Sequence, residues 1–476
     1  MLHRFALIGL VVAVVAAVAA ATAVGGGRAA ASSDTDFTVA PDEPLVTDFG
    51  GFGAQFNQHL YAAISGPPAN IAQLEQLVTV VRAPFVRVFF NTGALTDEDK
   101  LTSFYRTVEL ARRSEAELNI TWQGSSPAFA VANAPRFAAI IAKALEARRG
   151  SWVWVTMFNE PNSTRITLAQ YEDVYRHLDA ELRALGIRDR VRFMGGDLLG
   201  STSPLGQTQA EWFRFLASDM GDLLEAWSVH IYWDFWDTAK IDRRLVDDVL
   251  KTTATIPLSE RRPLYVTEFG VRGVATFEGE SNFQPGQWPD GTLMTLTTTA
   301  AFQHAWFMLR AAQLGYTATA KWDMYSAKYD VGLQDHSAIG LEAGRWTPRP
   351  VYELLRFLTW TTEPRHGRTV AVHGGESRDA TRLVTAYRSP GNNLTVLGLD
   401  RRGGLVATVD ESRVAYTIRG LPVHSLFRLL LWNADGDSEV KEIGYLDTGA
   451  DGVVTFAVPV RAVFALTDTP LPMPPW

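Results

Sequence analysis

The sequence predicts an α/β fold, a (β/α)8 (TIM) barrel, followed by a C-terminal all-β sandwich domain. Two patterns along the 476 residues support this prediction. Between residues 45 and 362, short apolar runs alternate with amphipathic segments, which is typical of parallel strands joined by helical crossovers. From residue 363 to 470, short apolar runs are separated by Gly, Asp and Asn without helical periodicity, which is typical of a β-sandwich.

Eight apolar runs in the first region predict the strands of the barrel. They are rich in β-branched and aromatic residues and are bounded by turn-forming residues. They cover residues 51–57, 85–90, 118–123, 152–158, 191–196, 226–232, 263–268 and 318–323. Because a barrel of this kind carries its site at the carboxyl ends of its strands, the residues that end these runs are the candidates for function.

Helical periodicity predicts the crossovers between the strands. The clearest one begins with a capping box of Thr167 and Gln170 and stops at Gly186. We expect its apolar stripe to pack against the sheet. The segment 270–291 is long for a connection and therefore predicts a functional loop. The predicted helices cover 71–81, 97–116, 136–149, 168–185, 242–253, 293–314 and 351–358.

Six short apolar runs predict the strands of the sandwich. They cover residues 370–373, 382–387, 394–399, 414–418, 427–431 and 453–458. Residues 32–44 form a linker that we expect to join this domain, with a strand or two within 34–47. The barrel then takes residues 45–362 and the sandwich takes 363–470.

Composition narrows the classes of function. A net charge of −8 without a long basic run makes nucleic acid and anionic membrane surfaces unexpected partners. The absence of cysteine excludes disulfides, thiolate metal sites and a cysteine nucleophile. No His or Asp spacing suggests a metal site, and no phosphate-binding loop or serine nucleophile is present, so we predict no metal and no cofactor.

The N-terminus predicts export from the cytoplasm. His3 and Arg4 precede an apolar run that ends in small residues before position 31. A basic start, an apolar core and a small-residue exit are typical of a secretory signal peptide. The run is also long enough to remain as a membrane anchor. We favour cleavage of segment 1–31, which predicts a secreted or cell-wall-associated protein.

Two glutamates end buried strands: Glu160 after the fourth strand and Glu268 after the seventh. In a barrel, these positions face each other across the central mouth. Hydrolysis of a glycosidic bond with retention needs two carboxyl groups about 5–5.5 Å apart, one as nucleophile and one as acid and base. The two glutamates therefore predict glycoside hydrolysis.

The motifs around these strand ends resemble those of the clan A retaining glycoside hydrolases. The matching segments are Phe158-Asn159-Glu160-Pro161, Tyr265-Val266-Thr267-Glu268-Phe269-Gly270 and Val229-His230-Ile231-Tyr232. The resemblance implies Glu160 as acid/base and Glu268 as nucleophile. It further implies that Asn159 holds the sugar 2-hydroxyl, that Tyr232 contacts the nucleophile and that His230 borders the sugar subsite.

Two further residues and the second domain extend this resemblance. Arg87 matches the clan's arginine that braces the nucleophile, and Trp322 matches its stacking tryptophan. A barrel followed by a β module is similar to the β-xylosidase/α-L-iduronidase, glucocerebrosidase/xylanase and arabinofuranosidase families of the clan.

Other strand residues are weaker candidates. Trp122 is retained as a residue that lines the sugar site, whereas Trp154 is assigned to the core. Asp197 and Asp323 also end strands, where either could bind sugar hydroxyls.

The sequence thus predicts an exported retaining glycoside hydrolase that acts on a cell-wall or plant-type polysaccharide or oligosaccharide. An arabinofuranosidase or arabinanase with the same carboxyl pair is the competing enzyme. A non-catalytic carbohydrate-binding barrel protein is the alternative from another class, and it would need neither glutamate.

Overall fold

The structure is a computed structural model, and it describes most of the chain from Thr35 onward. The described residues are 35–62, 70–124, 126–148, 151–272, 296–325, 336–362, 366–374, 381–402, 404–405, 412–435 and 438–470. The predicted export segment and most of the predicted loop at 270–291 lie outside them. Within the described ranges, no helix combines the length and the apolar character that crossing a membrane requires.

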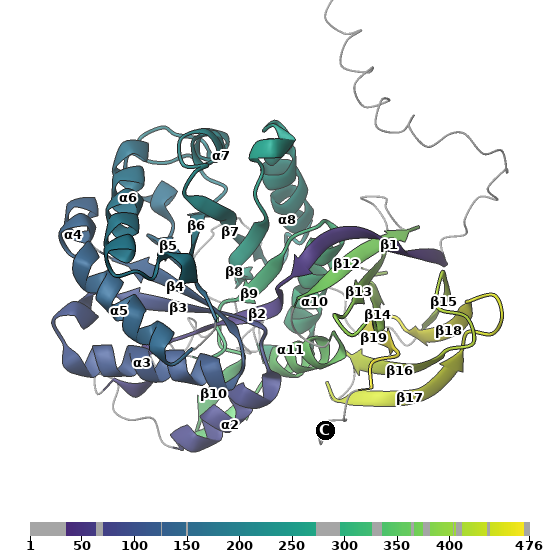
Figure 1. Ribbon diagram of the computed structural model, residues 1–476. Helices are drawn as coiled ribbons and strands as arrows, with labels where there is room; N and C mark the ends of the chain where they lie inside the picture. Colours follow the sequence, from purple (N-terminus) through teal and green to yellow (C-terminus); the bar gives the residue numbers. More distant parts are fainter. Residues whose placement is uncertain are drawn as a thin grey trace, which may run out of the picture.

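Eight parallel strands close into a barrel (Figure 1). Each pairs with the next along the chain, and β9 pairs with β2 to complete the ring. The predicted (β/α)8 barrel is therefore confirmed, and the carboxyl ends of its strands form one rim. The strands are β2 (Gly51–Phe56), β3 (Phe85–Asn91), β4 (Glu117–Gln123), β5 (Val153–Met157), β6 (Val191–Leu198), β7 (Leu224–Asp234), β8 (Leu264–Arg272) and β9 (Ala318–Lys321).

Helices surround the barrel, with α10 and α11 on the side that meets the second domain (Figure 1). The capping box of Thr167 and Gln170 opens α6 as expected. The helix α7 was not predicted, although Thr208 and Glu211 form a second capping box at its start. The helices are α2 (Ile71–Val81), α3 (Glu98–Arg113), α4 (Pro127–Ala132), α5 (Ala134–Glu146), α6 (Leu168–Ala184), α7 (Gln209–Ser218), α8 (Ala239–Asp242), η6 (Arg243–Leu250, a π-helix), α9 (Lys251–Thr253), α10 (Thr298–Gln313) and α11 (Pro350–Thr361).

Shorter elements complete the barrel. Turns of 3-10 helix are η1 (Gln58–Tyr61), η3 (Thr92–Leu95), η4 (Pro161–Ser163), η5 (Arg188–Arg190) and η7 (Leu258–Glu260). A two-stranded hairpin, β10 (Ile339–Glu342) with β11 (Arg345–Pro348), lies between β9 and α11 in the chain.

The barrel interior has an apolar floor beneath a polar layer. Buried side chains of the floor are Phe85, Trp154, Met194, Ala226, Tyr265, Ala318 and Ala320. Toward the carboxyl ends, the buried side chains at the inward-facing positions are polar, namely Gln55, Arg87, Asn119, Thr121, Thr156, Ser228 and Thr267. The floor closes the barrel from below, so charged groups above it are reached from the rim. The expected assignment of Trp154 to the core agrees with this arrangement.

The second domain is a nine-stranded sheet that folds over its own core. β1 pairs antiparallel with β12 and parallel with β15, so the N-terminal segment joins this domain up to Phe49, farther than the expected 32–44. The strands are β1 (Asp36–Phe49), β12 (Gly367–His373), β13 (Arg382–Arg388), β14 (Leu394–Asp400), β15 (Arg413–Arg419), β16 (Leu426–Asn433), β17 (Val440–Asp447), β18 (Val454–Pro459) and β19 (Ala462–Thr467). The sequence patterns did not predict β17 and β19.

Residues on opposite faces of the sandwich strands pack into two different apolar cores, one inside the sandwich and one shared with the barrel. On β14, Leu394 and Val396 pack inside the sandwich. Leu397 and Leu399 belong to the cluster that also contains the side chains of α10 and α11. The barrel and the sandwich therefore share one continuous apolar core, consistent with the contact between them in Figure 1.

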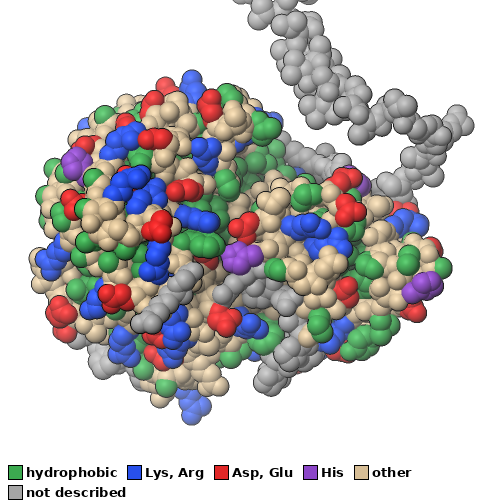
Figure 2. Space-filling model, in the orientation of Figure 1, with side chains coloured by type: hydrophobic (Ala, Val, Ile, Leu, Met, Phe, Trp, Pro, Cys, Tyr) green, Lys and Arg blue, Asp and Glu red, His purple; other side chains and the backbone are tan. Residues whose placement is uncertain are grey.

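Polar contacts also join the sandwich to helices α10 and α11 of the barrel. Arg461 is buried; its Nε donates to Asp435 over 2.7 Å and its Nη2 to Thr299 Oγ1 over 3.1 Å. Thr395 Oγ1 donates to the carbonyl of Thr361 at the end of α11. On the face in Figure 2, Lys and Arg side chains are interspersed with Asp and Glu side chains over both domains.

We predict that Leu399→Ala lowers the free energy of unfolding by about 2–5 kcal/mol, because it leaves a cavity in the shared core. The control is Leu426→Ala, since Leu426 lies on β16 with 59% of its surface exposed and should change stability by less than about 0.5 kcal/mol. Urea unfolding followed by tryptophan fluorescence measures both. Equal effects of the two substitutions would contradict a shared core.

Candidate active site

Glu268 reaches the barrel mouth because β8 contains a β-bulge. Tyr265 and Thr267 face the interior, so strict alternation would turn Glu268 outward. The pairing of β8 with β7 shifts by one residue between Val266 and Glu268. The extra residue, Thr267, turns the next side chain inward, as bulges beside active sites do.

Glu160 is placed by a turn with two left-handed residues. Phe158 has φ 70° and Glu160 has φ 51°, both uncommon for residues other than glycine. Phe158 is buried, with its ring centroid 6.4 Å from that of Tyr171 on α6. Pro161 then begins η4. The buried phenylalanine fixes the turn, and strained backbone of this kind often occurs at functional sites.

Asp197 turns into the barrel through an irregularity in β6. The pairing with β7 shifts between Gly195 and Leu198. Gly196 has φ 124°, and a Cβ there would lie 2.3 Å from the carbonyl oxygen of Ser228, so glycine is required. Asp197 itself has φ 53° and is fully buried.

Arg87 connects these strands at the centre of the site. The side chain is completely buried and all five of its N–H groups have acceptors. Although burial opposes the charge, Asp197 and Glu268 outweigh it and raise the pKa of Arg87 above its usual value. The guanidinium donates to Gln55 Oε1, Thr121 Oγ1, Asn159 Oδ1, Asp197 Oδ2 and Glu268 Oε2 over 2.5–3.0 Å.

Both carboxylate oxygens of Glu268 accept a hydrogen bond. Arg87 Nη1 donates to Oε2 over 2.6 Å, and the hydroxyl of Tyr232 donates to Oε1 over 2.5 Å. The two contacts implied by the resemblance, from the arginine and the tyrosine, are therefore present. They fix the carboxylate in one orientation, with 6% of the residue exposed.

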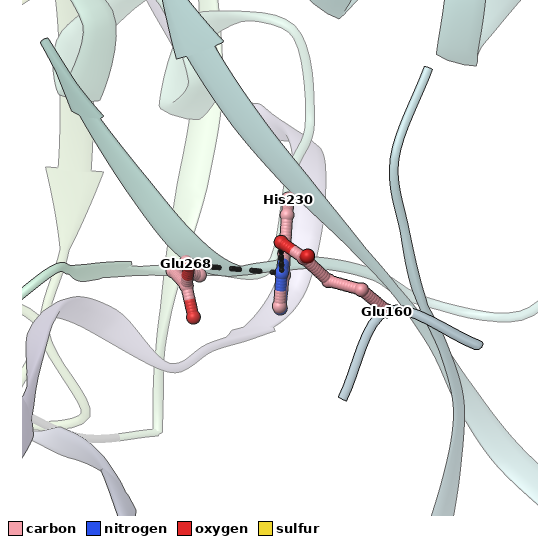
Figure 3. A group of neighbouring side chains, drawn as sticks. All are labelled: Glu160, His230 and Glu268. Carbon is pink, nitrogen blue, oxygen red and sulfur yellow. Dashed lines mark hydrogen bonds and ion pairs between the residues drawn. The ribbon is translucent and has the colours of Figure 1, made fainter. Parts of the chain in front are cut away.

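His230 lies between the carboxyl groups (Figure 3). Its Nδ1 is 3.0 Å from Glu160 Oε1 and 3.9 Å from Glu268 Oε1, and its Nε2 is 3.4 Å from Asp197 Oδ1. Burial favours the neutral ring, but Glu268 and Asp197 outweigh it and raise the pKa of His230 to about 9. His230 is therefore an imidazolium at neutral pH.

The two glutamates are close neighbours. One oxygen of Glu160, one oxygen of Glu268 and one ring nitrogen of His230 lie within 4.8 Å of one another. Such a group can hold a metal ion in principle, but Nδ1 of His230 already contacts Glu160 Oε1 over 3.0 Å. Both oxygens of Glu268 also accept hydrogen bonds already. The arrangement fits a pair of reacting carboxyl groups better than a metal centre.

Trp322 lies at the mouth, next to the end of β9. Its ring is partly exposed, and its centroid is 5.6 Å from that of Phe89. Phe89 in turn lies 4.4 Å from the Arg87 guanidinium carbon. The stacking role of Trp322 stays a prediction, as does the sugar contact of Asn159.

The prediction that Trp122 lines the site is wrong. Its ring is fully buried, 5.8 Å from Phe90 and 4.9 Å from Phe137 of α5. Its Nε1 donates to the carbonyl of Gly124. On β4, residue 122 faces the helices, whereas Asn119 and Thr121 face the barrel interior and bond to the polar layer.

The expectation for Asp197 also needs correction. The carboxylate is fully buried, and its oxygens accept from Arg87, Ser228 and Thr267, so it does not present them to a sugar. Asp323 is buried as well, with 1% exposed. Sequence reasoning also missed Gln55 and Thr121, which hold Arg87; their signal was a polar residue at an inward position of a strand.

The fold is a (β/α)8 barrel with an attached sandwich, and comparison with solved structures finds the same fold. One similar structure is the catalytic domain of the GH30 xylanase C from Talaromyces cellulolyticus, with a TM-score of 0.63 and 12% identity. The alignment covers 91% of this chain and 100% of that chain. A family 51 α-L-arabinofuranosidase from Bifidobacterium longum has a TM-score of 0.61 and 12% identity. That alignment covers 92% of this chain and 100% of the arabinofuranosidase chain.

A third similar structure is a bacterial orthologue of human α-L-iduronidase, with a TM-score of 0.56 and 13% identity over 91% of this chain and 83% of that chain. No family model and no curated protein sequence matches the chain. The predicted resemblance to the clan A glycoside hydrolases is thus confirmed for the fold.

We predict that Arg87→Met lowers the free energy of unfolding by about 3–5 kcal/mol, because it leaves the carboxylates of Asp197 and Glu268 buried without their cation. Arg82→Met is the matched control, since Arg82 forms an exposed pair with Glu115 over 3.5 Å. Such pairs contribute about 0–1 kcal/mol. Calorimetry or urea unfolding compares the two, and equal losses would contradict the central position of Arg87.

Proposed function

We propose that the protein is a retaining glycoside hydrolase with Glu268 as nucleophile and Glu160 as acid and base. The observation that supports this most is the separation of the two carboxyl groups, which have oxygens within 4.8 Å of each other. Retention needs a spacing of about 5–5.5 Å, whereas inversion needs about 6.5–9.5 Å to accommodate a water molecule. Glu160 follows β5 and Glu268 lies within β8, and both are on the carboxyl side of the barrel, which supports their acting on one substrate.

In the first step, an oxygen of Glu268 attacks the anomeric carbon and forms a glycosyl ester. The bond from that carbon to the leaving oxygen breaks, and Glu160 gives its proton to the leaving oxygen. Arg87 and Tyr232 hold the Glu268 carboxylate in place through their hydrogen bonds, which suits a nucleophile. Glu160 has a more exposed side chain, at 19%, which suits a group that exchanges protons with substrate and water.

In the second step, water replaces the alcohol that has left. Glu160, now a carboxylate, takes a proton from the water while the oxygen attacks the anomeric carbon and the ester bond to Glu268 breaks. Two inversions leave the sugar with its original configuration. Asn159, held by Arg87, would bind the 2-hydroxyl, and Trp322 would stack on the sugar ring.

The proposed substrate is a cell-wall or plant-type polysaccharide or oligosaccharide. Similar structures include a xylanase and a xyloglucanase, which supports this class. The basic and apolar N-terminal segment at 1–31 supports export, so we propose that the enzyme acts outside the cytoplasm.

An arabinofuranosidase is the second candidate, because the family 51 α-L-arabinofuranosidase is among the similar structures. The two candidates use the same carboxyl pair and differ in the ring size of the sugar. Release of nitrophenol from a panel of aryl pyranosides and furanosides separates them.

We predict that Glu268→Gln lowers kcat by more than about 10⁴-fold, because no covalent intermediate can form. Glu160→Gln should lower kcat about 10²- to 10⁴-fold on glycosides with poor leaving groups and leave ligand binding intact. Glu172→Gln is the control, since Glu172 pairs with Arg176 on the surface of α6. Rates on the aryl glycoside panel and binding by calorimetry test both variants.

Two results would contradict the proposed function. One is turnover by Glu268→Gln at the rate of the Glu172→Gln control. The other is glycan binding by the natural chain without turnover of any glycoside, which would favour the carbohydrate-binding alternative.

A further inference from the structure

Asp197 is a third carboxylate at the site, and the two-step reaction does not use it directly. Its Oδ2 accepts from Arg87 Nη2 over 2.5 Å, and its Oδ1 lies 3.4 Å from His230 Nε2. One buried carboxylate thus contacts both basic groups: Arg87 binds Glu268, and His230 lies 3.0 Å from Glu160 and 3.9 Å from Glu268.

The protein holds Asp197 rigidly in this position. The hydroxyls of Ser228 and Thr267 donate to Oδ1 over 2.8 and 2.5 Å. The backbone N–H of Asp197 contacts Ser228 Oγ over 2.7 Å, and the N–H of Gly196 donates to the hydroxyl of Tyr171 over 2.9 Å. The carboxylate therefore has a fixed direction, which a residue that orients others requires.

Asp197 is the carboxylate that lies against both basic groups of the site, Arg87 and His230. Burial alone raises the pKa of a carboxyl group, but here Arg87 and His230 outweigh it and hold the pKa of Asp197 well below its usual range. Asp197 stays ionised throughout the working pH range.

We propose that Asp197 is a positioning residue of the reaction, which orients the His230 imidazolium toward Glu160 and the Arg87 guanidinium toward Glu268. The proposal rests on the proposed glycoside hydrolysis. In the charged ring, Nε2 forms an ion pair with Asp197 Oδ1 over 3.4 Å, and Nδ1 is left to donate to Glu160 Oε1 over 3.0 Å. When Glu160 becomes a carboxylate in the glycosyl-enzyme, it meets a charged donor that is already in place.

The pKa of His230 provides a measurement of the positioning role of Asp197. The groups that face it are Asp197 from β6, Glu160 after β5, Glu268 from β8 and Arg87 from β3. The raised pKa, about 9, keeps the ring charged at neutral pH, and the charge is lost as the pH rises through that value. Removal of the Asp197 charge should lower the pKa of His230, so the ring would lose its proton at a lower pH.

We predict that Asp197→Asn, which keeps the shape and removes the charge, lowers kcat/KM about 100-fold or more, as loss of an orienting carboxylate does in other histidine networks. The alkaline limb of its pH–rate profile should move to lower pH. The matched control is Asp179→Asn on α6, where the carboxylate binds Arg183 and Arg188 away from the site. This control should keep the pH profile and the activity.

The experiment is an NMR titration of the full chain labelled with ¹⁵N-histidine, with His230→Gln to assign the signal among the nine histidines. We expect His230 to titrate near pH 9 in the natural chain and in Asp179→Asn, and at least about one unit lower in Asp197→Asn. A His230 that titrates near 6.5 in the natural chain would overturn the proposal, even if Asp197→Asn fails to fold. An unchanged pH profile and rate in a folded Asp197→Asn would overturn it as well.

The titration needs no substrate, so it separates the two proposals. A His230 that titrates as expected in a chain that hydrolyses no glycoside would count against the proposed function. It would leave the effect of Asp197 on the protonation of His230 supported.

Discussion

The buried guanidinium of Arg87 joins more parts of the barrel than any other side chain described above. Its N–H groups have acceptors on β2, on β4, in the turn after β5, on β6 and on β8. Burial of a guanidinium costs several kcal/mol, and here two carboxylates and three neutral acceptors offset that cost. The same contacts fix Glu268 and Asp197, so the geometry of the site depends on this one cation.

The apolar floor of the barrel makes this arrangement effective. Charges that lie above an apolar floor and below the rim interact more strongly than they would in water. The sandwich packs against α10 and α11 on the outer side of the barrel and shares their core, which supports β8, the strand that carries Glu268, and β9, the strand that Trp322 follows. The second domain is thus part of the scaffold that holds the site.

Much of the fold and of the site could be predicted from the sequence, because apolar runs mark buried strands and the polar residues that follow them mark the rim. The direction in which individual side chains point could not be predicted from the sequence. Bulges at Thr267 and near Gly196, and the left-handed residues Phe158 and Glu160, override the alternation of a regular strand. These irregularities arise from tertiary pairing, which a local pattern does not contain.

One error, the placement of Trp122, had a signal that was present in the sequence, whereas the two missed strands, β17 and β19, had none. Leu118, Ile120 and Trp122 alternate with polar residues on β4, and in a barrel with a polar upper layer this pattern turns Trp122 outward. β17 was missed because it is an edge strand, exposed at most positions, and so lacks a clear alternation. β19 is buried throughout, so its short run gave no period.

The central claim is that Glu268 forms a covalent bond with the sugar, and trapping of that intermediate tests it most directly. The chain would be incubated with activated 2-deoxy-2-fluoro pyranosides and furanosides, and the intact mass and a peptide map would be measured. We expect one sugar to add its mass to the protein at Glu268. Label on another residue, or turnover of the parent glycoside with inverted product and no labelled enzyme, would contradict the account.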